Sequence, residues 1–119
     1  MIFTSYYAKL RALPTGIVPV SIALYSPHWY KGKEYKPLAP TIDILREYKA
    51  SGNSELYETR YAMVLDSLNC YKVLIDLYAI SFENDVVLMC YEKPTDFCHR
   101  HLAADWLNRH GIACQELDI

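Results

Sequence analysis

The sequence predicts one α/β domain over residues 1–119, a small three-layer fold in which helices flank a mainly parallel sheet of about four strands. Apolar runs of strand length alternate along the chain with segments of helical periodicity, which is the order typical of layered α/β folds. Residues Val86–Cys90 form a continuous apolar run, typical of a parallel strand buried on both faces. A length of 119 residues, of which 22% are charged, fits a single globular domain.

Four segments have the composition of strands. They are Ile2–Ser5, Val18–Leu24, Val86–Cys90 and Ile112–Leu117. The second segment contains Pro19 near its start, where a strand tolerates the missing N–H group. Helical patterns separate most of these segments, so we expect the strands to run parallel in one sheet.

Four helices are expected, and each has a recognisable start or stop. The first helix begins at Pro40 or Thr41 and ends at Ser51-Gly52, and the second is capped by Asn53 or Ser54. The third helix follows Asn69-Cys70. The fourth runs from about Phe97 to His110 and ends before Gly111. On the second helix, Tyr57 and Tyr61 lie four residues apart and therefore share a face, which we interpret as core.

The segment from Tyr25 to Pro40 is predicted to be a long irregular loop. It combines three prolines and a glycine with Tyr25, His28, Trp29, Tyr30 and Tyr35. A surface loop this long and this aromatic is typical of a binding segment or of a lid that packs on the core. Both interpretations stay open at this point.

Charge and hydropathy disfavour two classes of partner. Twelve basic and fourteen acidic residues give a formal net charge of −2, whereas duplex nucleic-acid binding usually requires a basic excess. No apolar run approaches the ~20 residues that span a bilayer. Because Met1–Tyr6 lacks the features of a signal peptide, we expect a cytoplasmic protein whose thiols stay reduced.

The carboxyl ends of the predicted strands indicate where a ligand would bind. In parallel sheets, ligands bind beyond these ends. Ser5 and Tyr6 follow the first strand, His28 and Trp29 follow the second, and the segment from Cys90 to Arg100 follows the third. These loops are expected to meet at one edge of the sheet.

The Cys98-His99-Arg100 triplet is predicted to form the first turn of the last helix, with Thr95 or Asp96 as its cap. The free N–H groups and positive dipole end of a helix favour anions. Arg100 adds a planar cation, and a thiol in this field has a lowered pKa. The segment is therefore expected to bind an anion or to activate Cys98.

The sequence was also compared with three specific types of cysteine site: a phosphatase-type loop, a zinc site and a redox pair. Six residues after Cys90 or Cys98 there is no arginine, so a phosphatase-type loop is disfavoured. The usual zinc spacings are missing, and we expect neither a metal nor a cofactor. A Cys90–Cys98 redox pair stays open, provided that the loop brings the two Cα atoms within ~7 Å. Cys70 and Cys114 are interpreted as small buried residues.

The stretch from Asp85 to Leu107 resembles the signature of the domain-of-unknown-function family 488. The family pattern is a strand that ends in Cys-x-Glu, then a loop, then Cys-His-Arg at the start of a helix. Here it falls on Cys90, Glu92, Cys98, His99 and Arg100. The resemblance extends to Thr4-Ser5-Tyr6, to Leu38-Ala39-Pro40 and to the Tyr57/Tyr61 helix. It implies a small cytoplasmic α/β domain of prokaryotes or phages, supplies no established reaction, and suggests that the five residues form one site.

Three interpretations of the site follow. In the first, the site binds a small anionic or nucleotide-like ligand and can be a thiol-dependent enzyme, with Cys98 as nucleophile and His99 or Glu92 as its acid–base partner. Its ligand-binding residues are Arg100, Cys90, Ser5, Tyr6, His28, Trp29 and Tyr91. In the second, the aromatic loop binds single-stranded nucleic acid or a protein. In the third, Glu92 and Arg100 form an internal ion pair that locks the strand–helix junction.

Overall fold

The computed structural model describes residues 1–92 and 97–119. Within these residues, five strands form one sheet in the order β3-β2-β4-β1-β5, and every pairing is parallel. The predicted α/β class is confirmed, with one strand more than expected. The strands are β1 (Ile2–Tyr6), β2 (Ile17–Ser21), β3 (Lys33–Glu34), β4 (Asp85–Cys90) and β5 (Cys114–Glu116). The additional strand, β3, lies inside the segment predicted to be an irregular loop.

Helices occupy the connections between the strands. The α-helices are α1 (Ile42–Ser51), α2 (Ser54–Asp66), α3 (Cys70–Ile80) and α4 (His99–Arg109), and two 3₁₀ helices are η1 (Tyr7–Ala12) and η2 (Lys36–Leu38). Thr41, Asn53 and Asn69 each accept a hydrogen bond from a backbone N–H in the first turn of α1, α2 and α3. Gly52 ends α1 in the left-handed conformation, as its sequence position predicts.

Strand β4 is the centre of the sheet, which explains its uninterrupted apolar sequence. It pairs with β1 on one side and with β2 on the other, and its residues from Val86 to Cys90 are fully buried. Val86 and Leu88 belong to one hydrophobic core, while Val87 and Met89 belong to a second core across the sheet. Both faces of this strand therefore have to be apolar.

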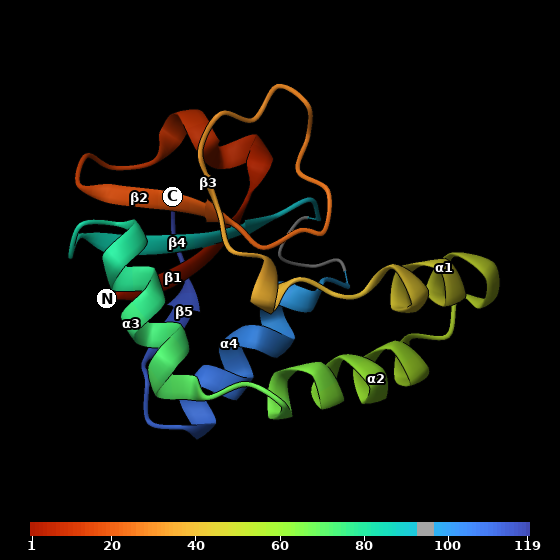
Figure 1. Cartoon of the computed structure of the whole chain (residues 1–119). Coiled ribbons are helices and arrows are strands. Elements are labelled where there is room, and N and C mark those ends of the chain that lie inside the picture. Colours follow the sequence, from red (N-terminus) through yellow and green to blue (C-terminus); the bar gives the residue numbers. More distant parts are fainter. Residues whose placement is uncertain (93–96) are drawn as a thin grey trace.

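The two faces of the sheet are covered unequally. Residues of α2, α3 and α4 fill the larger core, whereas η1 and the loop after β2 cover the smaller one (Figure 1). Helices α1 and α2 pack as a pair that extends beyond the sheet, on the side toward which the strands point (Figure 1). This α1–α2 hairpin therefore lies beside the edge of the sheet at which a ligand site is expected.

Several predicted boundaries differ from the structure, and two of these differences lie beside the expected site. The second strand ends at Ser21 rather than Leu24, although the Ile22 N–H still donates to the Met89 carbonyl at 3.0 Å before the chain turns away. Helix α4 begins at His99, with Cys98 at the cap position and no side-chain cap bond. The predicted caps Thr95 and Asp96 lie outside the described residues.

The sequence left open whether the segment from Tyr25 to Pro40 binds a partner or packs on the core, and two of its aromatic residues pack in the core. Tyr30 is buried in the smaller core, and its hydroxyl lies 2.7 Å from the Lys33 carbonyl oxygen. Tyr35 is buried in the larger core, and its hydroxyl donates to Asp76 Oδ2 at 2.6 Å. The two rings lie in the core while their hydroxyls keep polar partners. The composition of the loop does not reveal this burial.

In the described residues, no helix is both long enough and apolar enough to cross a membrane.

Gly32 allows the backbone to pass directly over Tyr30, because a Cβ atom there would overlap the tyrosine hydroxyl and ring carbons. We expect Gly32→Ala to lower the free energy of unfolding by about 1–3 kcal/mol, the usual cost of overpacking. Urea denaturation of both single variants and of the double variant with Tyr30→Leu would measure this. If the overlap is the cause, Gly32→Ala costs less in the Tyr30→Leu background, and strictly additive effects would contradict the explanation.

Candidate functional site

The predicted edge forms where β1, β4 and the start of α4 meet. Tyr6 at the end of β1 stands opposite Cys90 at the end of β4 in the parallel register. On the other side of β4, Ser21 of β2 stands opposite Met89. Three strand ends therefore lie together, as expected for a parallel sheet.

A disulfide joins Cys90 to Cys98. It connects the last residue of β4 to the cap position of α4, and the Cα atoms of the two residues are 7.4 Å apart. Both cysteines are buried, at 0% and 3% exposure. The bond between Cys90 and Cys98 that the sequence left open is therefore present, at a Cα separation slightly above the ~7 Å expected for it. Cys70 and Cys114 are free and buried, as expected.

His99 follows Cys98 directly, and its ring is held in one orientation. Its Nε2 lies 2.7 Å from the Ile22 carbonyl oxygen, and its ring packs edge-on against Tyr61. A carbonyl oxygen only accepts hydrogen bonds, so Nε2 carries the proton. Burial, together with the nearby charge of Arg100, lowers the pKa of His99 to about 4 although the Ile22 bond opposes this shift. The neutral ring thus presents an unprotonated Nδ1, which lies 3.9 Å from the Cys98 sulfur.

Arg100 is fully buried and makes contacts with three elements. Its Nε and Nη2 groups donate to the two carboxylate oxygens of Glu116 at 3.1 and 3.0 Å. Its Nη1 group donates to the Cys90 sulfur at 3.1 Å and to the main-chain carbonyl of Glu92. The ring of Tyr6 lies 5.6 Å from the guanidinium carbon. Four of the five N–H groups of the guanidinium are therefore used inside the protein.

The ion pair expected between Glu92 and Arg100 is replaced by one between Arg100 and Glu116. Glu116 was not among the predicted site residues; it lies in β5 opposite Thr4 of β1. The Thr4 hydroxyl donates to Glu116 Oε1 at 2.6 Å and holds the carboxylate in place. The β1–β5 register places Glu116 at the same edge of the sheet as Tyr6. A prediction of that register would therefore have identified Glu116 as the partner of Arg100.

A cavity of about 310 Å³ opens beside Cys98 and His99. Its aromatic walls come from loops at the strand ends, from the α1–α2 hairpin and from Phe97, and they comprise Tyr25, Tyr48, Tyr57, Tyr91 and Phe97. Ala23, Leu24, Pro40 and Leu45 complete the apolar lining, and Glu92 contributes a carboxylate. The cavity is therefore suited to a flat, mostly apolar group with a polar substituent.

Two of these walls are Tyr48 of α1 and Tyr57 of α2, and Tyr57 was interpreted from the sequence only as core. Their ring centroids are 5.3 Å apart, and Phe97 packs against both. Burial, and to a smaller extent the charge of Glu92, raises the pKa of Tyr57, so its hydroxyl stays protonated. Helical spacing indicates that a face is buried, but it cannot show that part of that face borders a cavity.

The remaining predicted site residues divide into two groups. Tyr91 lines the cavity, and its hydroxyl donates to the Tyr25 carbonyl at 2.6 Å. Ser5 is buried within β1, while His28 and Trp29 are exposed, and none of these three lines the cavity. Folding thus brings together Cys90, Cys98, His99, Glu92 and Tyr91, and it leaves the others at the margin.

Comparison with known proteins identifies the family. The model of the subclade described as "DUF488-N3a: Active DUF488-N3 subclade" matches residues 8–111. The chain belongs to this DUF488 subclade. The match includes the cavity residues, the disulfide and Arg100, while Glu116 lies beyond it. No curated protein and no solved structure matches the chain significantly.

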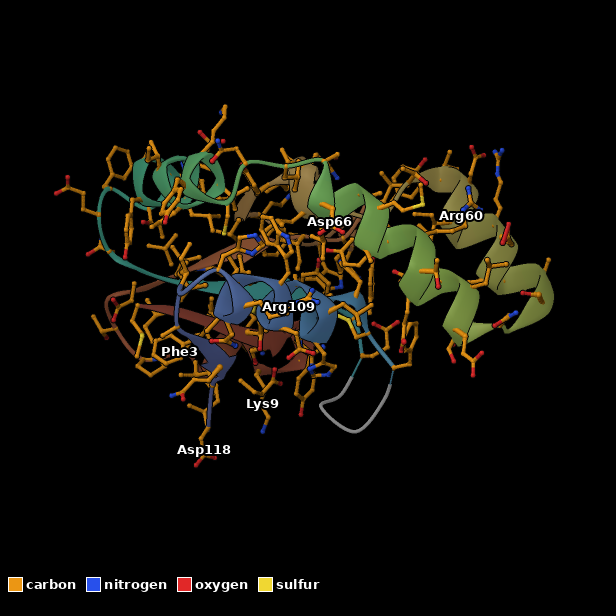
Figure 2. All side chains as sticks on the ribbon, turned by 90° about the horizontal axis from the view of Figure 1, so that it is seen from below. Phe3, Lys9, Arg60, Asp66, Arg109 and Asp118 are labelled. Atoms are coloured by element: carbon orange, nitrogen blue, oxygen red, sulfur yellow. A yellow bond between two sulfur atoms is a disulfide. The ribbon has the colours of Figure 1, made fainter. Side chains whose placement is uncertain are left out.

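The buried pair between Arg100 and Glu116 is expected to contribute more to stability than any surface pair of the same charges. Arg100→Ala leaves a carboxylate without its partner and should lower the free energy of unfolding by about 3–5 kcal/mol. Arg60 on the outer hairpin (Figure 2) is the matched control, since it pairs with Glu47 at 2.7 Å in a partly exposed position. Arg60→Ala should cost about 0–1 kcal/mol.

Urea denaturation measures both values, and Arg100→Lys extends the comparison because lysine keeps the charge but not the planar fork. Equal losses for Arg100→Ala and Arg60→Ala would contradict a central role of the buried pair.

Proposed function

We propose that this DUF488 domain is a thiol-dependent enzyme that acts on a small ring-bearing compound bound in the cavity at the strand ends. Cys98 is the nucleophile and His99 is its base. The observation that carries the proposal is the unprotonated Nδ1 of His99, which faces the Cys98 sulfur at 3.9 Å where both residues line the cavity. A base held by a third group beside a nucleophile is the usual arrangement in nucleophilic catalysis.

The reaction requires the reduced form of the chain. In that form, Nδ1 accepts the proton of the Cys98 thiol, and the N-terminal end of α4 stabilises the resulting thiolate. The sulfur then forms a bond to an electrophilic carbon of the bound compound. The leaving group departs with the electrons of the broken bond and takes the proton from His99. A second nucleophile, such as water, later releases the product from the sulfur.

The lining of the cavity supports a nucleotide-like substrate more strongly than a bare anion. Tyr48, Tyr57 and Phe97 offer ring faces and edges to a flat group, and the Glu92 carboxylate can accept hydrogen bonds from N–H groups on a base. Arg100, which we expected to bind an anion, has most of its donors occupied by Glu116, Cys90 and Glu92. We therefore assign it a positioning role.

The disulfide form would be an inactive state of the proposed enzyme. While Cys98 is bonded to Cys90, its sulfur is not available as a nucleophile. The cytoplasmic location expected from the sequence would keep the pair reduced and the enzyme competent.

Alkylation of the reduced chain tests the nucleophile. With iodoacetamide at neutral pH, Cys98 should be modified first, since burial raises the pKa of Cys70 and raises that of Cys114 to about 12. His99→Gln keeps a donor for the Ile22 carbonyl but removes the base, and should slow modification of Cys98 at least about tenfold. Mass spectrometry of the peptides gives the rate at each cysteine.

Without reduction, Cys98 should not be modified at all. The proposal fails if reduced Cys98 reacts no faster than a free thiol in solution, or if His99→Gln leaves its rate unchanged.

A second candidate function is supported by exposed aromatic residues, two of which, Tyr25 and Tyr91, also line the cavity, while Trp29 lies outside it. Tyr25, Trp29 and Tyr91 are exposed by 65%, 51% and 51%, and the rings of Trp29 and Tyr91 both pack against Tyr7. Such a group can stack on the bases of single-stranded nucleic acid, or contact a protein, without any catalysis.

Tryptophan fluorescence distinguishes this function from the first. Trp106 is buried, so quenching by a single-stranded oligonucleotide would come mainly from Trp29. In a binding module, Trp29→Ala should weaken binding roughly five- to 150-fold, measured by filter retention, while Cys98→Ser leaves it intact. An absence of quenching at high oligonucleotide concentration would exclude single-stranded nucleic acid as the partner.

A further inference from the structure

We propose that the reduced chain binds one Zn²⁺ ion through the sulfur atoms of Cys90 and Cys98 and through Nδ1 of His99, with the fourth coordination position open toward the cavity. This inference goes beyond the proposed function, because it assigns a metal ion to these residues and includes Cys90 as a ligand. The spacing of the cysteines and histidines in the sequence disfavours zinc, but spacing no longer decides the matter once the fold has brought the residues together.

The ligand atoms already lie close to one another, although the two sulfur atoms have to separate once the disulfide is reduced. The two sulfur atoms and a ring nitrogen of His99 all lie within 4.8 Å of one another, and the three residues are buried. Zinc bonds of ~2.3 Å to sulfur and ~2.0–2.1 Å to nitrogen place a sulfur and a nitrogen roughly 3.6 Å apart in a tetrahedral site. The observed distance from Cys98 Sγ to His99 Nδ1 is 3.9 Å.

The separation of the two cysteines also suits an intervening ion. Their Cα atoms are 7.4 Å apart. Directly bonded cysteines usually have Cα separations of ~4.4–6.8 Å. Two sulfurs on one zinc ion stand roughly 3.8 Å apart and therefore accommodate more widely spaced backbones than a direct bond.

The surroundings supply the outer contacts that such a site needs. A histidine that ligates a metal typically donates its other N–H to a carbonyl, as His99 Nε2 does to Ile22. Arg100 donates to the Cys90 sulfur at 3.1 Å, which suits a thiolate. Zn²⁺ balances two thiolates, and Glu116 balances Arg100 at 3.0 Å, so the buried group as a whole carries no net charge.

The ligand types select the class of metal. Thiolate and imidazole favour zinc over Mg²⁺ or Ca²⁺, which prefer oxygen ligands. Binding replaces the protons of the two thiols: one Zn²⁺ enters, two protons leave to solvent, and no electrons are transferred. Because Cys98 and His99 line the cavity, the fourth ligand would be water or an atom of the bound compound. Metal, disulfide and free nucleophile are thus three mutually exclusive states of the Cys98 sulfur.

Cobalt substitution tests the site in the full chain. The protein is reduced with a phosphine and transferred to oxygen-free buffer. Titration with Co²⁺ should then produce one equivalent of tetrahedral visible bands with a near-ultraviolet thiolate charge-transfer band. Zn²⁺ should displace the cobalt. Cys90→Ser should weaken binding at least about a hundredfold, because loss of an outer contact alone costs ~10–100-fold. Cys70→Ser and Cys114→Ser should bind like the unmodified chain.

Two further measurements separate this proposal from the proposed function. His99→Gln should also lose the cobalt bands. This variant serves as a second test if circular dichroism shows that Cys90→Ser is unfolded. Cys90→Ser should keep the fast alkylation of Cys98. Slow alkylation of Cys98 with intact cobalt bands would overturn the nucleophile and leave the metal site standing. Absence of a thiolate band in the reduced chain, or cobalt binding that survives both variants, would overturn the metal site.

Discussion

The buried guanidinium of Arg100 is the contact on which the rest of the site depends. It has no exposed surface, and it joins α4 to Glu116 in β5, to the Cys90 sulfur at the end of β4 and to the Glu92 carbonyl that follows. A cation without solvent has to be neutralised and hydrogen-bonded, so its partners must adopt one arrangement. The first turn of α4 is thereby fixed against the strand ends, and Cys98 and His99 are fixed with it.

The chemistry of the site follows from this placement. His99 is neutral because it is buried, and the Ile22 carbonyl decides which of its nitrogens is free. That free nitrogen faces Cys98, whose sulfur is bonded to Cys90. The observed state is the disulfide. Under our proposals, the same residues serve as a nucleophile with its base or as metal ligands once the disulfide is reduced.

Local features of the sequence predicted the framework well, because they depend on neighbouring residues. The apolar run of Val86–Cys90 identified the central strand, and Asn53 marked the start of α2. The Cys-x-Glu and Cys-His-Arg motifs indicated the strand–helix connection at which the disulfide and the cavity lie. The burial of Tyr30 and Tyr35 could not be inferred, because an irregular segment rich in proline carries no periodicity from which to infer burial.

The sequence by itself determined the α/β class, four of the five strands, the four α-helices and the residues of the proposed site, because periodicity, caps and motifs act over short distances along the chain. Only the tertiary structure decided that Arg100 pairs with Glu116 rather than Glu92, that Cys98 is bonded to Cys90, and that aromatic residues of α1 and α2 wall a cavity beside them. These contacts join segments that meet only when strands adopt a register and helices pack on the sheet, and no local pattern specifies that register.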